Sequence, residues 1–434
     1  MSRYTEYRES GTGWLDELPS HWQLRRISAL YDARNVKVSD QDYPPLSVTM
    51  QGIVPQLETA AKTQDGDNRK LVRTGDFVIN SRSDRRGACG ISAYDGSVTL
   101  ISNVLAPKDR DVMSTRYYSY LFRSEGFADE FYRQGTGIVD DLWSTNWSRM
   151  KNILVACPPL TEQERIAEYL DAKTAEIDAL ISDCEREVEL LREYRRAVIS
   201  EAVTKGLDPD APMKDSGVEW IGEIPEHWEA GKLLRHARLE SGHTPSRQHP
   251  EWWLEEECTI PWVTTGDVHR FRDGIMMSID DTVEHVSIIG LANSSARLLP
   301  AGTVALSRTA SVGFSIVLNK PMASSQDFAD WVPDDALDSF YLLYSLRSMD
   351  VVFKQLQMGS THKTIYMPDI MKLAVAFPPL EEQRAIVDYL NAKTAGIDSL
   401  IEAKRQMADK LREYRKSLIS EAVTGKFKVP GVNR

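Results

Sequence analysis

Apolar and long side chains recur at steps of three and four residues in two stretches of the chain that read almost alike. The first stretch runs from Pro158 to Thr204 and the second from Pro378 to Thr424, and more than half of the aligned positions are identical without a gap. Steps of three and four place such side chains on one stripe of a helix. Each stretch therefore predicts one long helix of about 42 residues, which spans roughly 60 Å at 1.5 Å per residue.

The ends of both stretches carry signals of helix boundaries. Two prolines precede each stretch and exclude helix upstream of it. Thr161 and Glu164 predict a capping box at the start of the first helix, whereas the second copy lacks this pair. Gly206 and Gly425 follow the last turns, where a left-handed residue is least costly as glycine.

An apolar stripe of this length needs a partner, and the other copy is the obvious one. The segment 207–215 after the first helix is short and contains proline, so the second half of the chain starts near the end of that helix. Antiparallel pairing satisfies this connection, whereas a parallel pair needs a return path of about 60 Å. The positions that we expect to pair the helices are Ile166, Leu170, Ile177, Leu191, Ile386, Leu390, Ile397 and Leu411. The alternative is that each stretch is an ordinary core helix.

Short apolar runs bounded by Gly, Asp and Pro fill the regions before each long helix. Examples are 45–49, 76–80 and 97–101 in the first region and 260–263 in the second, and this pattern is typical of strands. Residues 117–132 predict one helix among them. The sequence thus predicts an α+β fold in which two α/β domains are separated by two long helices that pair as an antiparallel coiled coil, with a pseudo-two-fold internal repeat.

The predicted domain boundaries follow the long helices. They are 1–157 for the first α/β domain, 158–206 for the central helix, 207–377 for a linker with the second α/β domain, 378–425 for the distal helix and 426–434 for a C-terminal tail.

A second repeat precedes each α/β domain. Residues 10–22 end in Pro19-Ser20-His21-Trp22, and residues 216–228 end in Pro225-Glu226-His227-Trp228. Glycine, proline and tryptophan in this order predict a turn and a short strand that pack an indole at the entry of the domain. We interpret this clasp, including both histidines, as structural.

Charge and cysteine usage narrow the function classes. The net charge of −12 argues against a general nucleic-acid coat, but the charge is uneven: residues 1–157 are near neutral, 205–377 are the most acidic and 378–434 are positive. The 4 cysteines show neither a pairing pattern nor metal spacing, which indicates a reducing compartment. No signal peptide and no long apolar run are visible, so we expect a cytoplasmic protein without a membrane span.

Polar loops between the strands are candidates for binding. The basic loop 81–87 and the loop that begins at Arg308 place arginine where it can contact phosphate or read guanine bidentately. The alternative interpretation is a solvated turn. Glycine-containing polar loops at 134–137 and 357–363 precede the return to each long helix, and 242–246 forms a further polar turn.

Catalytic motifs are missing from the sequence. We find no phosphate loop, no dinucleotide fingerprint, no amino-methyltransferase signature and no spacing of His and Cys that predicts a metal site. The histidines at 243, 249, 269, 285 and 362 are scattered without an obvious acidic partner. The sequence therefore predicts neither catalytic residues nor a metal site, although three scattered carboxylates could still form a nuclease centre.

The plan resembles the specificity subunit of a type I restriction-modification enzyme. The residues that carry the resemblance are Pro-Pro-Leu-x-Glu-Gln at 158–163 and 378–383, Tyr-Leu at 169–170 and 389–390, Ala-Lys-Thr at 172–174 and 392–394, Ile-Asp at 177–178 and 397–398, Ser-Glu-Ala-Val-Thr at 200–204 and 420–424, and the two clasps. The resemblance covers the chain from end to end.

The resemblance implies a non-catalytic subunit with two target-recognition domains, each of which reads one half of a split, asymmetric site on double-stranded DNA. It implies that the helices space these domains and dock two methyltransferase (modification) subunits, and that restriction subunits join the complex. Cofactors are expected in those partners and not in this chain: S-adenosylmethionine, ATP and magnesium. Matching of positions with the family gives the following candidates for residues that face DNA: Ser81, Arg82, Arg85, Arg86, Gln134, Thr136, Thr244, Ser246, Arg247, Arg308, Thr309, Ser360, Thr361 and Lys363.

Two other classes of function stay open at this point. A two-domain coiled-coil scaffold that does not bind DNA predicts no footprint on DNA with any partner. A self-sufficient nuclease predicts cleavage by the chain with magnesium alone.

Overall fold

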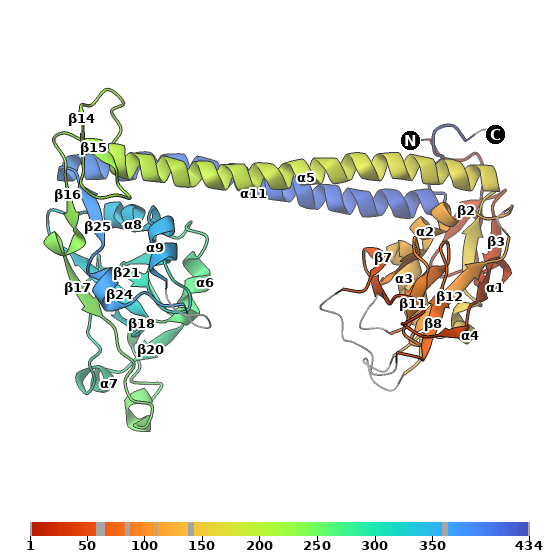
Figure 1. The fold of residues 1–434 in the computed structure, drawn as a ribbon, viewed down its shortest axis with the longest axis horizontal. Coiled ribbons are helices and arrows are strands. Elements are labelled where there is room, and N and C mark those ends of the chain that lie inside the picture. Colours follow the sequence, from red (N-terminus) through yellow and green to blue (C-terminus); the bar gives the residue numbers. More distant parts are fainter. Residues whose placement is uncertain are drawn as a thin grey trace. The chain divides into compact units, whose positions relative to one another are not determined.

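The computed structural model describes residues 2–57, 66–82, 87–109, 111–137, 143–357 and 363–432 (Figure 1). The chain divides into two compact units. Unit 1 comprises Met1–Glu185 with Gln406–Arg434, and unit 2 comprises Arg186–Arg405. Each unit therefore contains one α/β domain together with parts of both long helices.

Both predicted long helices are present. Helix α5 (Leu160–Lys205) has 46 residues and α11 (Leu380–Val423) has 44. The predicted glycines end them in the left-handed conformation, with φ of 76° at Gly206 and 75° at Gly425. The predicted capping box is wrong, because α5 already begins at Leu160 and Thr161 lies inside its first turn. The carbonyl of Pro159 instead accepts from the amides of Glu162 and Gln163, at 2.9 and 3.0 Å.

The antiparallel direction of the pair is visible inside each unit. In unit 1, Asp178 of α5 pairs with Arg415 of α11 at 3.1 Å, and Glu185 pairs with Arg412. Residues later in α5 therefore pair with residues earlier in α11. In unit 2 the same order continues, with Glu187 beside Lys404 and Arg195 2.9 Å from Asp398. The predicted pairing is confirmed within each unit.

The α/β domain of unit 1 is built from antiparallel strands. Its strands are β1 (Tyr7–Glu9), β2 (Glu17–Pro19), β3 (Gln23–Arg26), β4 (Tyr31–Ala33), β5 (Lys37–Val38), β6 (Leu46–Thr49), β7 (Gly52–Pro55), β8 (Arg69–Val72), β9 (Phe77–Asn80), β10 (Cys89–Ile91), β11 (Gly96–Val98), β12 (Ser102–Pro107) and β13 (Leu154–Cys157). Its short helices are α1 (Ile27–Leu30), α2 (Thr115–Arg123), α3 (Glu125–Arg133) and α4 (Trp147–Met150). The main sheet has the order β10-β9-β12-β4, and a smaller one has β11-β8-β5.

Two expectations about this domain are corrected by the structure. Residues 117–132 form two helices, because Ser124 leaves the helical region with ψ of 149° and its hydroxyl caps α3 through the amide of Phe127. The run 97–101 is not one strand, since β11 ends at Val98 and β12 begins at Ser102.

The α/β domain of unit 2 repeats this plan with additions. Its strands are β14 (Met213–Asp215), β15 (Glu223–Pro225), β16 (Glu229–Lys232), β17 (Ala237–Ser241), β18 (Ile260–Val263), β19 (Ser278–Ile279), β20 (Glu284–Val286), β21 (Val304–Ser307), β22 (Ser315–Leu318), β23 (Ala323–Ser324), β24 (Phe328–Pro333) and β25 (Ala374–Phe377). Its short helices are η3 (Leu233–Arg235), η4 (Pro250–Trp253), η5 (Thr265–Asp267), α6 (Val268–Phe271), α7 (Ile288–Ala292), α8 (Ser339–Arg347), α9 (Asp350–Leu356) and α10 (Met367–Ile370). The order β17-β24-β21-β22 repeats that of unit 1, and β19 extends it in parallel to β22.

Both clasps bury an indole, as the sequence predicts. Trp22 is 1% exposed and Trp228 is 0% exposed. The neighbouring histidines face a carboxylate at the start of the long helix in the same unit: His21 lies 2.9 Å from Glu162, and His227 lies 2.8 Å from Glu382. The clasps therefore fasten the start of each long helix to its α/β domain.

A glutamine in each helix start makes the same connection in both units. Gln163 accepts from the amide of Ser114 at 2.8 Å and donates to the carbonyl of Pro158 at 2.8 Å. Gln383 accepts from the amide of Asp338 and donates to the carbonyl of Pro378, again at 2.8 Å each. Because both side chains are buried, each amide satisfies backbone groups that would otherwise stay unpaired.

The core of unit 2 contains a carboxyl group that forms no ion pair with any basic side chain in the described part of the chain. Asp330 on β24 is fully buried, accepts from the hydroxyl of Ser324 and lies opposite Glu240 of β17. Its Oδ1 has no hydrogen-bond partner among the described residues. Burial, with a smaller contribution from the charge of Glu240, raises the pKa of Asp330 from 3.8 to about 7. The folded state therefore holds this proton over a range of pH in which the unfolded chain has released it.

We predict that Asp330→Asn flattens the pH dependence of stability. A raised folded pKa contributes stability that is present below pH 3.8 and is lost as pH rises towards about 7. The loss between these values is about 1.4 kcal/mol per pH unit. Chemical denaturation between pH 4 and pH 8 measures it, with the exposed Asp335→Asn as control. An unchanged slope in the Asp330 variant would contradict the prediction.

Candidate nucleic-acid interface

The first predicted loop of unit 1 follows β9 and is only partly free to bind. Ser81 is buried, its hydroxyl donates to the carbonyl of Ile101 at 2.5 Å, and its carbonyl accepts from the amide of Thr145 at 2.9 Å. Arg82 is exposed, and its amide donates to the side chain of Asn80 at 3.0 Å. Ser81 therefore anchors the loop, and Arg82 presents its side chain to solvent.

The second predicted loop of unit 1 joins the first one through Ser144. The backbones of Thr136 and Ser144 exchange two hydrogen bonds of 3.0 Å. The backbone of Ser144 also forms an isolated antiparallel β-bridge with that of Arg82. Gln134 turns away, since its amide donates to Glu130 at 2.8 Å. The structure thus brings Arg82 and Thr136 together and leaves Gln134 at the C-cap of α3.

Trp143 fixes the shape of this loop pair. Its indole stacks on Tyr132 with ring centroids 5.6 Å apart and donates to the Tyr132 carbonyl at 2.9 Å. A Cβ atom at Gly135 would lie 2.2 Å from the indole nitrogen of Trp143. The glycine in the predicted loop is therefore required by the close approach of this ring.

Unit 2 joins its corresponding loops in the same way. Thr309, after β21, bridges to Thr364, and the amide of Ala310 donates to the carbonyl of Lys363 at 3.0 Å. The amide of Ile365 donates to the carbonyl of Arg308 at 2.9 Å. The structure thus places Arg308, Thr309 and the exposed Lys363 beside one another.

Gln326 connects a third predicted loop to this group. Its side-chain oxygen accepts from the hydroxyl of Thr244 at 2.6 Å, and its backbone carbonyl accepts from the guanidinium of Arg308 at 2.7 Å. Sequence reasoning missed Gln326, because the chain carries no motif around it. Gln326 lies in the loop 325–327 between β23 and β24, and only the fold brings this loop beside Thr244 and Arg308.

Arg247 and Ser246 belong to a separate cluster in unit 2. The guanidinium of Arg247 lies 3.9 Å from the ring centre of Trp253 and 3.0 Å from a carboxylate oxygen of Glu284. The carbonyl of Ser246 accepts from the indole of Trp253 at 3.2 Å. The charge of Arg247 is thus already paired and stacked in this structure.

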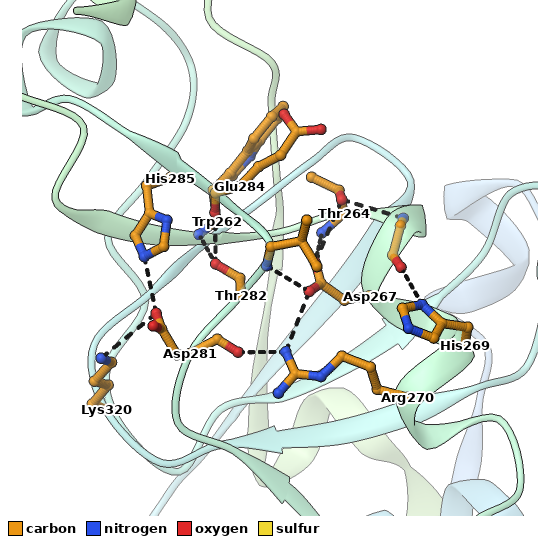
Figure 2. A network of polar contacts seen from close by, with 12 residues as sticks. Trp262, Thr264, Asp267, His269, Arg270, Asp281, Thr282, Glu284, His285 and Lys320 are labelled. Carbon is orange, nitrogen blue, oxygen red and sulfur yellow. Dashed lines mark hydrogen bonds and ion pairs between the residues drawn. The ribbon is translucent and has the colours of Figure 1, made fainter. Parts of the chain in front are cut away.

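A network of polar contacts connects residues of the segment 262–285, as Figure 2 shows. The buried carboxylate of Asp267 accepts from the amides of Thr264 at 3.0 Å and Val283 at 2.9 Å. Arg270 lies 3.5 Å from the same carboxylate and donates to the carbonyl of Asp281 at 2.7 Å. Two backbone donors and one cation satisfy this buried charge, so the network supports the loops rather than supplying a free acid.

The expectation that the scattered histidines lack acidic partners is wrong for two of them. His285 lies 2.9 Å from Asp281, and this hydrogen bond lowers the pKa of the aspartate. His249 lies 2.9 Å from Glu251 and stacks on Trp252. Both partners lie within four residues in sequence, and the spacing alone gave no indication which of the many nearby acids would face each ring.

The remaining DNA-facing candidates are Arg85, Arg86, Ser360 and Thr361, which lie outside the described residues. Within the described ranges no group of three or more His, Cys, Asp and Glu could hold a metal ion, and no helix is long and apolar enough to cross a membrane.

The predicted helix-pairing positions lie in the cores of the two units. Ile166, Leu170 and Ile177 are buried in the core of unit 1, with Leu411 packed against them. Ile386 and Leu390 are buried in the core of unit 2. Ile397 lies in a small cluster with Val188 and Ile401 that Leu191 covers.

Comparison with known proteins gives consistent matches. The family model of the type I restriction modification DNA specificity domain matches residues 225–408. A putative type I restriction enzyme MjaX specificity subunit of Methanocaldococcus jannaschii is 23% identical, over 96% of each chain. The MjaVIII specificity subunit of the same organism is also 23% identical, over 96% of this chain and 95% of the relative.

Solved structures share the fold. A chain from the structure of a type I R-M system superposes with a TM-score of 0.71 at 17% identity, over 94% of this chain and 98% of that one. The HsdS subunit of Thermoanaerobacter tengcongensis gives 0.55 at 17% identity over the same shares. The predicted fold class and the predicted resemblance to type I specificity subunits are confirmed.

We predict that Gly135→Ala disturbs the loop pair of unit 1. The new methyl group would overlap the indole of Trp143, which must leave its stack on Tyr132. We expect a loss of about 1–3 kcal/mol in stability and a change in tryptophan emission. Gly13→Ala is the control, since a Cβ atom added there would meet nothing within 4 Å. Equal behaviour of the two variants would contradict this account of the loop.

Proposed function

We propose that this chain, a member of the type I specificity subunits, selects the DNA sequence on which its complex acts, each α/β domain reading one half of a bipartite asymmetric site. One observation carries the proposal: the same frame occurs twice and carries two different sets of loops. The sheet order, the clasp and the glutamine contact recur in both units. The paired loops that extend from this frame differ in nearly every side chain.

The loop chemistry suits readout of DNA. Arg82 and Thr136 in unit 1, and Arg308, Thr309 and Lys363 in unit 2, are donors held on paired backbones at the ends of strands. Arginine and lysine can contact phosphate or pair with the edge of guanine, and threonine can pair with any base. Because the backbone pairing holds these described residues in place, they lose less backbone freedom on binding.

The proposed division of labour assigns no catalysis to this chain. In the proposed complex two methyltransferase subunits bind S-adenosylmethionine and dock on the helix pair, and restriction subunits use ATP and magnesium. The acidic character of unit 2 is consistent with this assignment, because partner subunits can supply part of the phosphate contacts. A scaffold that does not bind DNA is not favoured, since the region matched as a DNA specificity domain includes the loops of unit 2.

We predict that loop substitutions act on one half-site each. Arg82→Ala should relax the half-site of unit 1, and Arg308→Ala and Lys363→Ala that of unit 2. A lost bidentate base contact costs about 1–3 kcal/mol of discrimination, whereas a lost phosphate contact weakens all sequences alike. Binding of the assembled methyltransferase to half-site variants measures the effect.

Matched controls exist in both units. Arg26 on β3 and Arg235 on η3 are exposed arginines outside the loops, and their alanine variants should bind both half-sites normally. If all loop variants behaved like these controls, the loop assignment would be wrong.

We predict that the helices set the distance between the half-sites. Four residues inserted after Ala175 add about one turn, or roughly 6 Å, and keep the apolar stripe nearly in phase. The unread gap should lengthen by one or two base pairs, at about 3.4 Å each, with both half-sites unchanged. Mapping of methylated bases measures the gap. The same insertion after Asp210, in the exposed linker, should leave it unchanged, and an unchanged gap in the helix variant with full activity would show that the helices do not set the spacing.

A further inference from the structure

Two tyrosines show that the short helices α2 and α8 occupy equivalent places in their units. Tyr120 of α2 donates to Asp171 of α5 at 2.6 Å. Tyr344 of α8 donates to Asn391 of α11 at 2.8 Å. Asp171 and Asn391 are the same position of the two repeated stretches. Each short helix therefore lies on the long helices in the same way.

Two arginines are equivalent by the same argument. Arg195 and Arg415 are the same position of the repeat, and each pairs with the repeated aspartate of the opposite helix: Arg195 with Asp398 at 2.9 Å, and Arg415 with Asp178 at 3.1 Å. A second equivalent pair is Arg347 and Arg123, each three residues after the tyrosine on its short helix. Each unit thus presents two guanidinium groups between its short helix and the long helices.

In unit 2 the chain itself covers this pair of arginines. The segment 273–277, between α6 and β19, lies across them and contains a left-handed residue at Gly274. Arg195 donates to the carbonyl of Gly274 at 2.9 Å, and Arg347 donates to the same carbonyl at 2.8 Å and to that of Met276 at 2.7 Å. This burial lowers the pKa of Arg347 to about 10. A backbone segment with apolar side chains is therefore the ligand that this frame binds in unit 2.

In unit 1 the same place is an open groove of about 960 Å³. Its walls are α2, α3 and the long helices, and its lining includes Arg116, Ser119, Tyr120, Arg123, Arg415 and Ile419. The side chain of Arg415 is 35% exposed, compared with 12% for Arg195. Arg123 is exposed and donates to the carbonyl of Met50 at 2.9 Å. This contact corresponds to one of the carbonyl contacts that Arg347 makes in unit 2.

The charges of the groove exclude a polyanion and fit a peptide. Glu125, Asp129 and Asp171 line it together with the basic groups, so a phosphate backbone would meet carboxylates. Met50 and Ile419 add apolar surface. Guanidinium donors among balanced charges and apolar side chains are suited to main-chain carbonyls and methionine-like side chains.

We propose that the groove of unit 1 binds a short segment of a partner protein, which places its main-chain carbonyls on Arg123 and Arg415 as residues 273–277 do on their counterparts. The inference goes beyond the selection of DNA and does not depend on it, because it follows from the comparison of the two units. The partner segment should carry apolar side chains next to a glycine or another small residue, since Gly274 has φ of 75° and a Cβ atom added to it would lie 3.4 Å from Arg195.

The test uses a thiol in the groove of the full chain. Ser119→Cys is combined with Cys258→Ser, because the other cysteines are buried. The probe is the peptide Arg-Asp-Gly-Ile-Met-Met-Ser, which is residues 272–278 of this chain. We expect it to slow alkylation of the thiol severalfold and saturably, and a scrambled peptide to have no effect.

Two controls make the outcome decisive. Ser148→Cys on α4 places an exposed thiol outside the groove, and the peptide should not protect it. Arg123→Met should abolish protection, whereas Arg123→Lys should retain part of it. No protection at position 119, equal protection by the scrambled peptide, or full protection in the Arg123→Met variant would overturn the proposal. Since only the chain and the peptide are present, this result is independent of whether the chain selects DNA.

Discussion

The pairing of two long apolar stripes is the constraint on which the rest of the structure depends. A helix of more than forty residues cannot leave its stripe in water, and the other copy is long enough to cover it. Because the pair is antiparallel, the start of one helix and the end of the other lie in the same compact unit. The C-terminal glycine of α11 packs on Pro19 and Trp22 of one clasp, and that of α5 packs on Trp228 of the other.

This constraint explains which contacts recur and which do not. The groups that fasten each domain to the helices repeat almost atom for atom: the buried glutamine, the histidine–carboxylate contact and the tyrosine on the long helix. The Trp14 indole donates to Leu154 at 3.2 Å, and the Trp220 indole donates to Ala374 at 3.2 Å. The predicted binding loops take no part in these contacts, so their side chains are free to differ between the two units.

The two units differ in the segments that do not take part in these repeated contacts. Unit 2 adds β19 and the segment before it, which covers Arg347 of its short helix and Arg195 of α5. The described part of unit 1 has no such segment and keeps the place open. Burial also raises the pKa of Asp330 in the sheet of unit 2, and in unit 1 the buried Asp76 pairs with Arg34 at 2.6 Å. One duplicated frame thus supports two domains with different surfaces.

The sequence by itself determined the long helices, their terminal glycines, their antiparallel pairing, the α+β class and the buried clasps. These features rest on signals in the sequence: the spacing of apolar side chains, the conformational freedom of glycine and the internal sequence repeat. The same signals were wrong at Thr161 and across 117–132, because a capping box competes with an earlier helix start and a serine can end one helix while it caps the next.

Only the tertiary structure decided which polar residues meet. Gln326 joins Thr244 to Arg308, Ser144 joins Arg82 to Thr136, and Gly274 joins Arg195 to Arg347. The partners are separated by many residues of chain, and polar side chains follow no periodic pattern in the sequence from which their contacts could be predicted. Apolar residues are fixed by burial, which leaves a pattern in the sequence, whereas a hydrogen bond needs only one donor and one acceptor brought together by the fold.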